Sequence, residues 1–152
     1  MAHIDRMLAV TVVAIAGVQL SGCGAQPSHN SKVESVHVEH IDGSKLSRVT
    51  LTEKAIERIA LTTSVVREME VEGNPGSLLP RTVVPYSAVI YDTQGDAWVY
   101  VNGEPRSFLR HPIKIDYIKG DQAILLDGPA KDSVIATVGV AELYGAESGI
   151  GH

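Results

Sequence analysis

The sequence predicts a mainly β protein: a small antiparallel β-barrel or sandwich with one short N-terminal helix. Turn-forming clusters recur roughly every 8–12 residues through the second half of the chain, a spacing typical of such folds. One segment between turns alternates Ile113 and Ile115 with polar residues, as a half-buried strand does. Only the segment after Thr52 has a helical pattern. The rest of the chain is therefore expected to be leader, tether, strand or turn.

The chain begins with a segment expected to direct export. A short polar start precedes the apolar run Met7–Leu20, which has the length of a secretory signal core and is short for a membrane span. The run ends at Leu20-Ser21-Gly22-Cys23, which resembles the bacterial lipobox, a motif whose cysteine is acylated and becomes the mature N-terminus. We expect residues 1–22 to be a lipoprotein signal peptide and Cys23 to be lipidated, since two or three acyl chains anchor a protein stably. The alternative is an ordinary signal peptide or a short anchor helix with an incidental thiol.

Composition and charge narrow the function classes. Without residues 1–22 the chain has about 130 residues, the size of one small domain. The formal net charge of −5 stays the same, because the leader holds one acid and one base, Asp5 and Arg6. Such a chain lacks the basic face that nucleic acid requires and lacks a polybasic membrane-binding patch. The single cysteine excludes an internal disulfide and a multi-thiolate metal site.

Residues 23–45 are expected to form a flexible tether, because they are rich in Ser, His, Gly and Glu and show no helical stripe. Within them, His29, His37 and His40 lie near glutamates, and imidazoles with a carboxylate can bind a divalent ion such as Zn²⁺ or Cu²⁺. The alternative is a solvated tether that happens to contain histidines, since a flexible segment does not fix the geometry of a metal site. The sequence indicates no other cofactor.

A short helix is expected after Thr52. The Thr52 hydroxyl can cap the first turn, and Glu53 suits the positive end of the helix. The apolar residues of Glu53–Ala60 share one face, so this helix of about two turns must pack against other elements to be stable. A strand is expected next, over Leu61–Val71.

The second half is expected to consist of strands separated by turns. Glu72–Ser77 is a strong breaker cluster, and further turns are expected at Asp92–Asp96 and Lys119–Asp121. Because Pro85 cannot donate to a ladder, its segment should be an edge strand or begin after this proline. Asn102-Gly103 has the composition of a type I′ hairpin turn. The expected strands are Thr82–Tyr91, Ala97–Val101, Ser107–Ile118, Gln122–Leu126 and Val134–Val140.

The sequence contains no catalytic constellation, so we expect no enzyme activity. Ser87 lacks the surroundings of a nucleophile elbow, and the aspartates fall in turns, where they form local hydrogen bonds. His111 is expected to be structural, and Trp98 is expected to pack in a core or hairpin rather than to line a pocket. The apolar residues expected to hold the fold together are Val84, Val89, Trp98, Val99, Phe108 and Ile113.

Several of these segments resemble the C-terminal part of periplasmic adaptor proteins, the membrane fusion proteins of tripartite RND-type efflux pumps. In that family a "VP-x-x-AV" strand precedes a "W-V-x-V" strand and then an "F-x-x-x-x-V" strand. Leu51–Ile59 resembles the opening of many adaptors of the heavy-metal-efflux subgroup. The similar strand segments and C-terminus are Val84–Ile90, Gly95–Val101, Phe108–Ile113 and Ala141–Glu147.

The resemblance covers most of residues 46–148 and lacks the family's central domains. Full adaptors place an α-helical hairpin, a lipoyl-like domain and a β-barrel domain where this chain has only Glu72–Arg81, which is too short for a domain. The loop Gly128–Ser133 also departs from the family, with Ser133 in place of an acid. The resemblance therefore implies a membrane-proximal-domain-like β domain alone, followed by a tail over residues 149–152.

The function that the resemblance implies is a lipid-anchored, non-enzymatic, adaptor-like component of a transmembrane efflux system. Its expected partner is an inner-membrane transporter (an RND-type permease) or full-length adaptor subunits. The lipid anchor would hold it at the cell membrane, facing the periplasm or the cell exterior. Two alternatives stay open: a metal-binding lipoprotein that delivers ions to an exporter, and a truncated adaptor without activity of its own.

Overall fold

The computed structural model of this chain describes residues 35–72 and 76–149. The chain divides into two units, residues 1–32 and 33–152, and all described residues belong to the second unit. The expected signal peptide, Cys23 and His29 lie outside the described residues. Of the helices in the described ranges, none has the length and apolar character needed to span a membrane.

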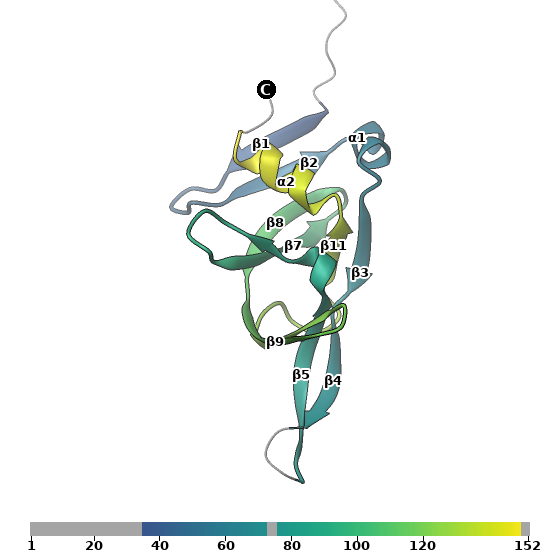
Figure 1. Cartoon of the computed structure of the whole chain (residues 1–152). Coiled ribbons are helices and arrows are strands. Elements are labelled where there is room, and N and C mark those ends of the chain that lie inside the picture. Colours follow the sequence, from purple (N-terminus) through teal and green to yellow (C-terminus); the bar gives the residue numbers. More distant parts are fainter. Residues whose placement is uncertain (1–34, 73–75, 150–152) are drawn as a thin grey trace, which may run out of the picture. The chain divides into compact units, whose positions relative to one another are not determined.

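The second unit is mainly β, as the sequence predicts, with two antiparallel sheets and two short α-helices (Figure 1). The larger sheet has seven strands in the order β1-β2-β8-β7-β11-β3, and β6 pairs with β7. Its strands are β1 Val36–His40, β2 Ser47–Leu51, β3 Thr62–Val65, β6 Ile90–Tyr91, β7 Ala97–Glu104, β8 Ser107–Pro112 and β11 Val134–Val138.

The smaller sheet has four strands in the order β4-β5-β10-β9. They are β4 Arg67–Glu72, β5 Leu78–Pro85, β9 Lys114–Lys119 and β10 Gln122–Asp127. Strands β1 and β3 end the larger sheet, and β4 and β9 end the smaller one. Neither sheet closes on itself, so the barrel alternative is wrong and the domain consists of two open sheets.

Helix α1 (Glu53–Arg58) forms where the sequence predicts it, and Thr52 caps it. The Thr52 hydroxyl accepts a hydrogen bond from the Ala55 amide at 3.2 Å. Ala55 is buried in the same apolar cluster as Val49 of β2, which supplies the packing that a helix this short requires. Ala60 then takes a left-handed φ of 47° and ends the helix.

A second helix, α2 (Val140–Glu147), corrects the expectation of a single helix. Gly139 precedes it with a left-handed φ of 81°, and a Cβ added there would lie 3.1 Å from Ile59. Glycine therefore allows both the turn and the close approach to the segment after α1. Only Val140 and Leu143 of this helix are buried. The other apolar residues of the segment do not gather with these two on one face, so helical periodicity is weak, which explains why the sequence did not reveal α2.

Two segments expected as single strands are each divided between the two sheets. The strand expected after α1 becomes β3 and β4, and the chain changes sheets at the fully buried Val66. The Val66 amide donates to the Ser133 carbonyl at 2.8 Å, and the Asp132 amide donates to the Val66 carbonyl at 3.0 Å. The strand expected from Ser107 likewise becomes β8 and β9, on either side of the buried Ile113. Sequence alternation continues through such a crossing and does not reveal it.

The expectation for Pro85 is wrong in both of its forms. Strand β5 is internal, between β4 and β10, and it ends at Pro85 rather than beginning there. A proline at the last position removes no hydrogen bond from the middle of the ladder. The next amide, that of Tyr86, donates to the Asp121 carbonyl at 2.7 Å, and a short 3₁₀ turn follows.

The β7–β8 hairpin exists, but its turn does not lie at Asn102-Gly103. Both residues belong to β7, and the chain reverses at Arg106, whose φ is 62°. The Asn102 side-chain amide donates to the carbonyls of Glu104 and Ser107, at 2.9 and 3.0 Å. The register of the strand pairing shifts between Asn102 and Glu104, which marks a β-bulge. Asn102 therefore stabilises the turn through its side chain but is not one of the residues at which the chain reverses.

The expected tether is corrected at its C-terminal end, where residues 36–40 form strand β1. Val36 pairs with Leu51 and His40 pairs with Ser47, so β1 and β2 make a regular antiparallel hairpin. The physical reason is the alternation of Val36 and Val38 with polar residues, which suits a sheet edge. The β domain therefore begins before residue 46.

The core consists of two apolar clusters. One lies around the helices and contains Val49, Leu51, Ala55, Tyr100, Phe108, Ala136, Val140 and Leu143. The other draws on both sheets and contains Val66, Val84, Ala88, Val99, Ile113, Ala123, Leu125 and Ile135. Four of the six residues expected to hold the fold are buried: Val84, Val99, Phe108 and Ile113. Val89 and Trp98 are half-buried.

Candidate functional site

His37 and His40, two of the three expected metal ligands, lie on β1 and do not share one face of the sheet. Side chains alternate along a strand, so residues three apart point to opposite faces. His40 Nδ1 lies 3.4 Å from the Ser47 hydroxyl on the paired strand. Within residues 35–72 and 76–149, no three His, Cys, Asp or Glu side chains come together in a way that would hold a metal ion. With His29 outside the described residues, the metal site stays a prediction.

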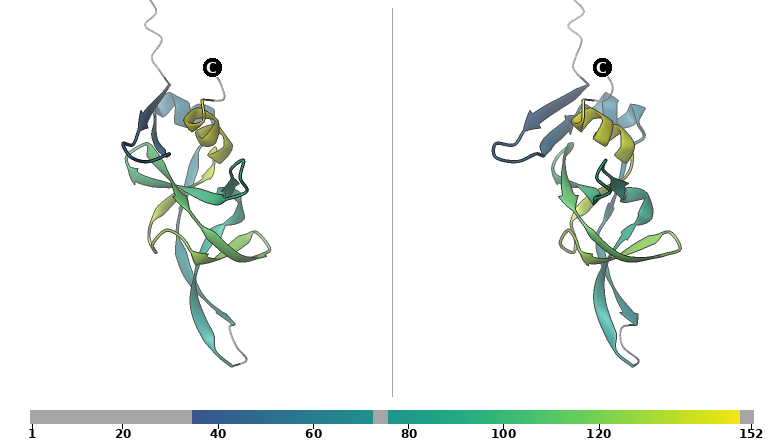
Figure 2. Two further views of the ribbon diagram at one scale, coloured as in Figure 1. Left: turned by 90° about the vertical axis from the view of Figure 1, so that its left-hand side faces the viewer. Right: turned by 60° about the vertical axis from the view of Figure 1, so that its left-hand side comes forward.

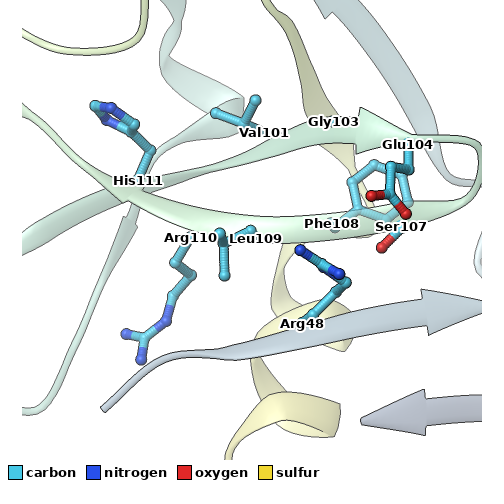
Figure 3. Close-up of a pocket in the computed structure, with 9 residues that line it drawn as sticks. All are labelled: Arg48, Val101, Gly103, Glu104, Ser107, Phe108, Leu109, Arg110 and His111. Carbon is cyan, nitrogen blue, oxygen red and sulfur yellow. The ribbon is translucent and has the colours of Figure 1, made fainter. Parts of the chain in front are cut away.

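A shallow depression of about 240 Å³ lies on β7, β8 and β2 (Figure 3). Its charged groups do not converge, because Arg110 points to one side of β8 and His111 to the other. Arg48 is already paired with Glu39 of β1 at 3.7 Å. The residues that line the depression are Arg48, Val101, Gly103, Glu104, Ser107, Phe108, Leu109, Arg110 and His111. This arrangement offers a mainly apolar surface and no converging set of reactive groups.

A buried ionic cluster joins α2 to the larger sheet. Arg110 Nε lies 2.7 Å from Glu147 Oε2, and their side chains are only 12% and 4% exposed. The contact is an ion pair without hydrogen-bond alignment, since the Nε–H has no acceptor in its direction. Tyr100 donates its hydroxyl to the same Oε2 at 2.6 Å, and the Ser47 amide donates to Oε1 at 3.2 Å. One carboxylate therefore ties together α2, β8, β7 and β2.

Aromatic rings enclose the arginine of this cluster. The Arg110 guanidinium lies 4.8 Å from the ring centre of Trp98 and 5.3 Å from that of Tyr144, close enough for cation–π attraction to both. Burial raises the pKa of Tyr100 far above its ordinary value, and the bond to Glu147 raises it further. Tyr100 therefore keeps its proton and acts as a hydrogen-bond donor. The cluster therefore has the character of a structural contact that holds α2 on the larger sheet, not of a reactive centre.

Asp92 organises the turn beside this cluster, in line with the expectation of local hydrogen bonds. Its Oδ1 accepts from the amides of Gln94 and Asp96 at 2.9 and 3.0 Å, and its Oδ2 accepts from the Trp98 indole at 3.0 Å. Burial acts to raise the pKa of Asp92, but the hydrogen bonds and the nearby Arg110 outweigh it and lower the pKa. Trp98 is thus held at both its polar edge and its ring face.

The β4–β5 hairpin is the candidate interaction surface. Its outer half extends beyond the other described strands and helices (Figures 1 and 2). Residues directly opposite in an antiparallel pair share one face, so the register assigns every side chain of the hairpin to one of two faces. The basic face holds Arg67, Met69, Val71, Leu79 and Arg81. The acidic face holds Glu68, Glu70, Glu72, Leu78 and Pro80.

Large apolar side chains are exposed on both faces of the hairpin. Leu78 on the acidic face is 59% exposed, and Met69 and Leu79 on the basic face are 44% and 43% exposed. Apolar side chains grouped with charges on a projecting element are typical of protein interaction sites. A depression of about 300 Å³ adjoins the basic face. It is lined by Ser64, Val65, Arg67, Met69, Val83, Val84, Pro85 and Gln122.

Sequence reasoning missed this surface, although a signal was present. Residues 67–72 read Arg-Glu-Met-Glu-Val-Glu, a strict alternation in which every second residue is a glutamate. On a strand this pattern places the three acids on one face. The segment was expected to be a strand, but nothing in the sequence paired it with the residues beyond the breaker cluster.

No known family model matches this chain, and no curated protein matches it.

Proposed function

We propose that this protein is a lipid-anchored, non-enzymatic, adaptor-like component of a transmembrane efflux system that docks on an inner-membrane transporter. The lipobox-like Leu20-Ser21-Gly22-Cys23 supports the anchor, and the strand segments quoted above support the likeness to adaptors. Exposed apolar side chains on a projecting hairpin support binding to another protein.

The observation that carries the proposal is that strands from the first part of the domain pair with strands from its second part. Strand β3, from the first half of the domain, pairs with β11 near the C-terminus, and β4 pairs with β5. The strands on either side of the point at which the resemblance would place the further domains of full adaptors pair directly with each other. There the chain turns back within the β4–β5 hairpin. This topology suits a membrane-proximal-domain-like unit that works without those domains.

The test is recovery of partners from native membranes. The full, lipidated chain with a C-terminal tag is purified under gentle detergent after crosslinking, and bound proteins are identified by mass spectrometry. The proposal expects enrichment of a membrane transporter with several spans relative to a Cys23→Ala control. The Cys23→Ala chain should also accumulate as unprocessed precursor. Recovery of the tagged chain alone, or a Cys23→Ala chain that stays lipidated and bound to membranes, contradicts the proposal.

A further inference from the structure

The two faces of the β4–β5 hairpin carry opposite charge. Two arginines lie on the basic face and three glutamates on the acidic face, and each face also presents exposed apolar side chains. Arg67 and Met69 of the basic face also line the adjoining depression. Leu78 of the acidic face is the most exposed large apolar side chain among the described residues. The hairpin thus displays two complementary surfaces on opposite sides of one thin element.

Most of these charges make no ion pair with another residue that the structure describes. Glu68 lies 3.8 Å from Lys131, in an exposed pair of little energetic weight. Across residues 35–72 and 76–149, the ion pairs involve neither arginine of the basic face and neither Glu70 nor Glu72. The glutamates also repel one another along the strand, because side chains two residues apart share a face. A partner of opposite charge would relieve this repulsion.

We infer that a second copy of this chain is the partner, with the basic face of one hairpin packed on the acidic face of the next. A two-fold arrangement would place like charges together, basic on basic or acidic on acidic. The charge pattern therefore favours a head-to-tail contact, which leaves one face free on each terminal copy and allows further copies to add. The exposed Met69 and Leu79 of the basic face offer an apolar surface to Leu78 of the neighbouring copy.

The area of the contact sets its strength. Six paired positions on two strands give a face of roughly 200 Å², since a strand rises ~3.3 Å per residue and strands lie ~4.8 Å apart. Stable complexes bury about 800 Å² on each partner. The contact is therefore weak in dilute solution. It gains occupancy when copies are confined together on a membrane, where their effective concentration is high.

The experiment measures energy transfer between copies of the full, lipidated chain in phosphatidylcholine vesicles. A cysteine added after His152 carries the dye, because the only other thiol, Cys23, is the one that the proposed function expects to be acylated. Wild-type chains should show transfer that rises with protein density and falls when salt increases from about 0.05 to about 0.5 M, which shortens the Debye length roughly threefold. Wild-type chains that show no transfer above random proximity overturn the inference.

Charge reversal identifies the faces. The variant Arg67→Glu with Arg81→Glu makes both faces acidic, and Glu70→Arg with Glu72→Arg makes the acidic face basic. Each variant alone should self-associate at least about tenfold more weakly than wild type, since two attractive pairs become repulsive. A mixture of the two variants should recover transfer, because every contact between unlike chains again pairs opposite charges.

Controls separate this contact from other effects. Lys114→Glu with Lys119→Glu, on β9, makes the same change in net charge as the arginine variant and should leave transfer unchanged. Arg81 is half-buried, so circular dichroism checks the fold of each variant, and the glutamate variant provides an independent route. If neither reversal weakens transfer, or if the mixture does not recover it, the inference is wrong. The inference rests on the lipid anchor of the proposed function, but the measurement uses no transporter, so failure of self-association is distinguishable from failure to bind a transporter.

Discussion

Charged side chains occur in two contrasting settings, the cluster around Glu147 and the β4–β5 hairpin. In the cluster, Glu147 and Arg110 are almost enclosed, and Tyr100 and a backbone amide complete the set of partners. On the hairpin, Glu70 and Glu72 are exposed and make no ion pair within the described part of the chain. Burial therefore decides what a charge does here: enclosed charges fix the fold, and exposed ones are available to another molecule.

The largest effect is expected from Glu147→Ala. Removing the carboxylate leaves Arg110 enclosed without its counter-charge, which costs about 3–5 kcal/mol of unfolding free energy. The matched control is Glu142→Ala on the exposed side of α2, which should cost less than about 0.5 kcal/mol. Denaturant unfolding of the full chain measures both. Equal unfolding midpoints for the two variants would contradict the expectation that the buried charge contributes more to stability than the exposed one.

Tyr100→Phe should have the next largest effect, about 1.5–2 kcal/mol, because it removes one hydrogen bond to a charged group. Its pH dependence follows from the raised pKa. A raised folded-state pKa stabilises the protein below the unfolded value of 10, and this stabilisation is lost as the pH rises above 10. The difference between wild type and Tyr100→Phe should therefore be constant up to about pH 9 and shrink by about 1.4 kcal/mol per unit above pH 10. Unfolding curves at pH 7, 9 and 11 measure it, and a difference independent of pH contradicts it.

The sequence predicted the elements of the fold better than their partners. Local signals were sufficient for helix α1, where the cap at Thr52 depends on residues three apart. They failed at Val66 and Ile113, because a change of sheet depends on contacts with Ser133 and other distant residues. The hairpin turn was misplaced because the Asn102 side chain bonds backbone groups across the turn, which composition does not show.

The candidate site was less predictable than the fold. The histidines drew attention by residue type, yet the strand geometry of β1 separates His37 from His40. The hairpin surface depends on which strand lies opposite β4, and the register that pairs Met69 with Arg81 is a property of the folded chain. Arg110 and Glu147 are 37 residues apart in sequence, so nothing local signalled their pairing.

A smaller effect is expected from Asp92→Ala, which removes the acceptor of two amides and of the Trp98 indole. The pKa of Asp92 is lowered in the folded state, so its contribution is present above the ordinary value of 3.8 and is lost as the pH falls below it. The stability difference from wild type should thus be visible at pH 7 and shrink below pH 4. Thermal unfolding at both pH values measures it, with Asp96→Ala in the same turn as control. A difference that grows in acid would show that the hydrogen bonds do not favour the charged form.

The smallest effect on stability is expected on the hairpin. Glu70→Lys with Glu72→Lys should change the unfolding free energy by less than about 0.5 kcal/mol, because both side chains are exposed. The sign should be neutral or stabilising, since the change removes repulsion along the acidic face. Denaturant unfolding at low protein concentration, where copies of the chain do not associate, measures this change in unfolding free energy separately from any association. A loss as large as that of Tyr100→Phe would mean that these charges also hold the fold, and the contrast between the two settings would no longer stand.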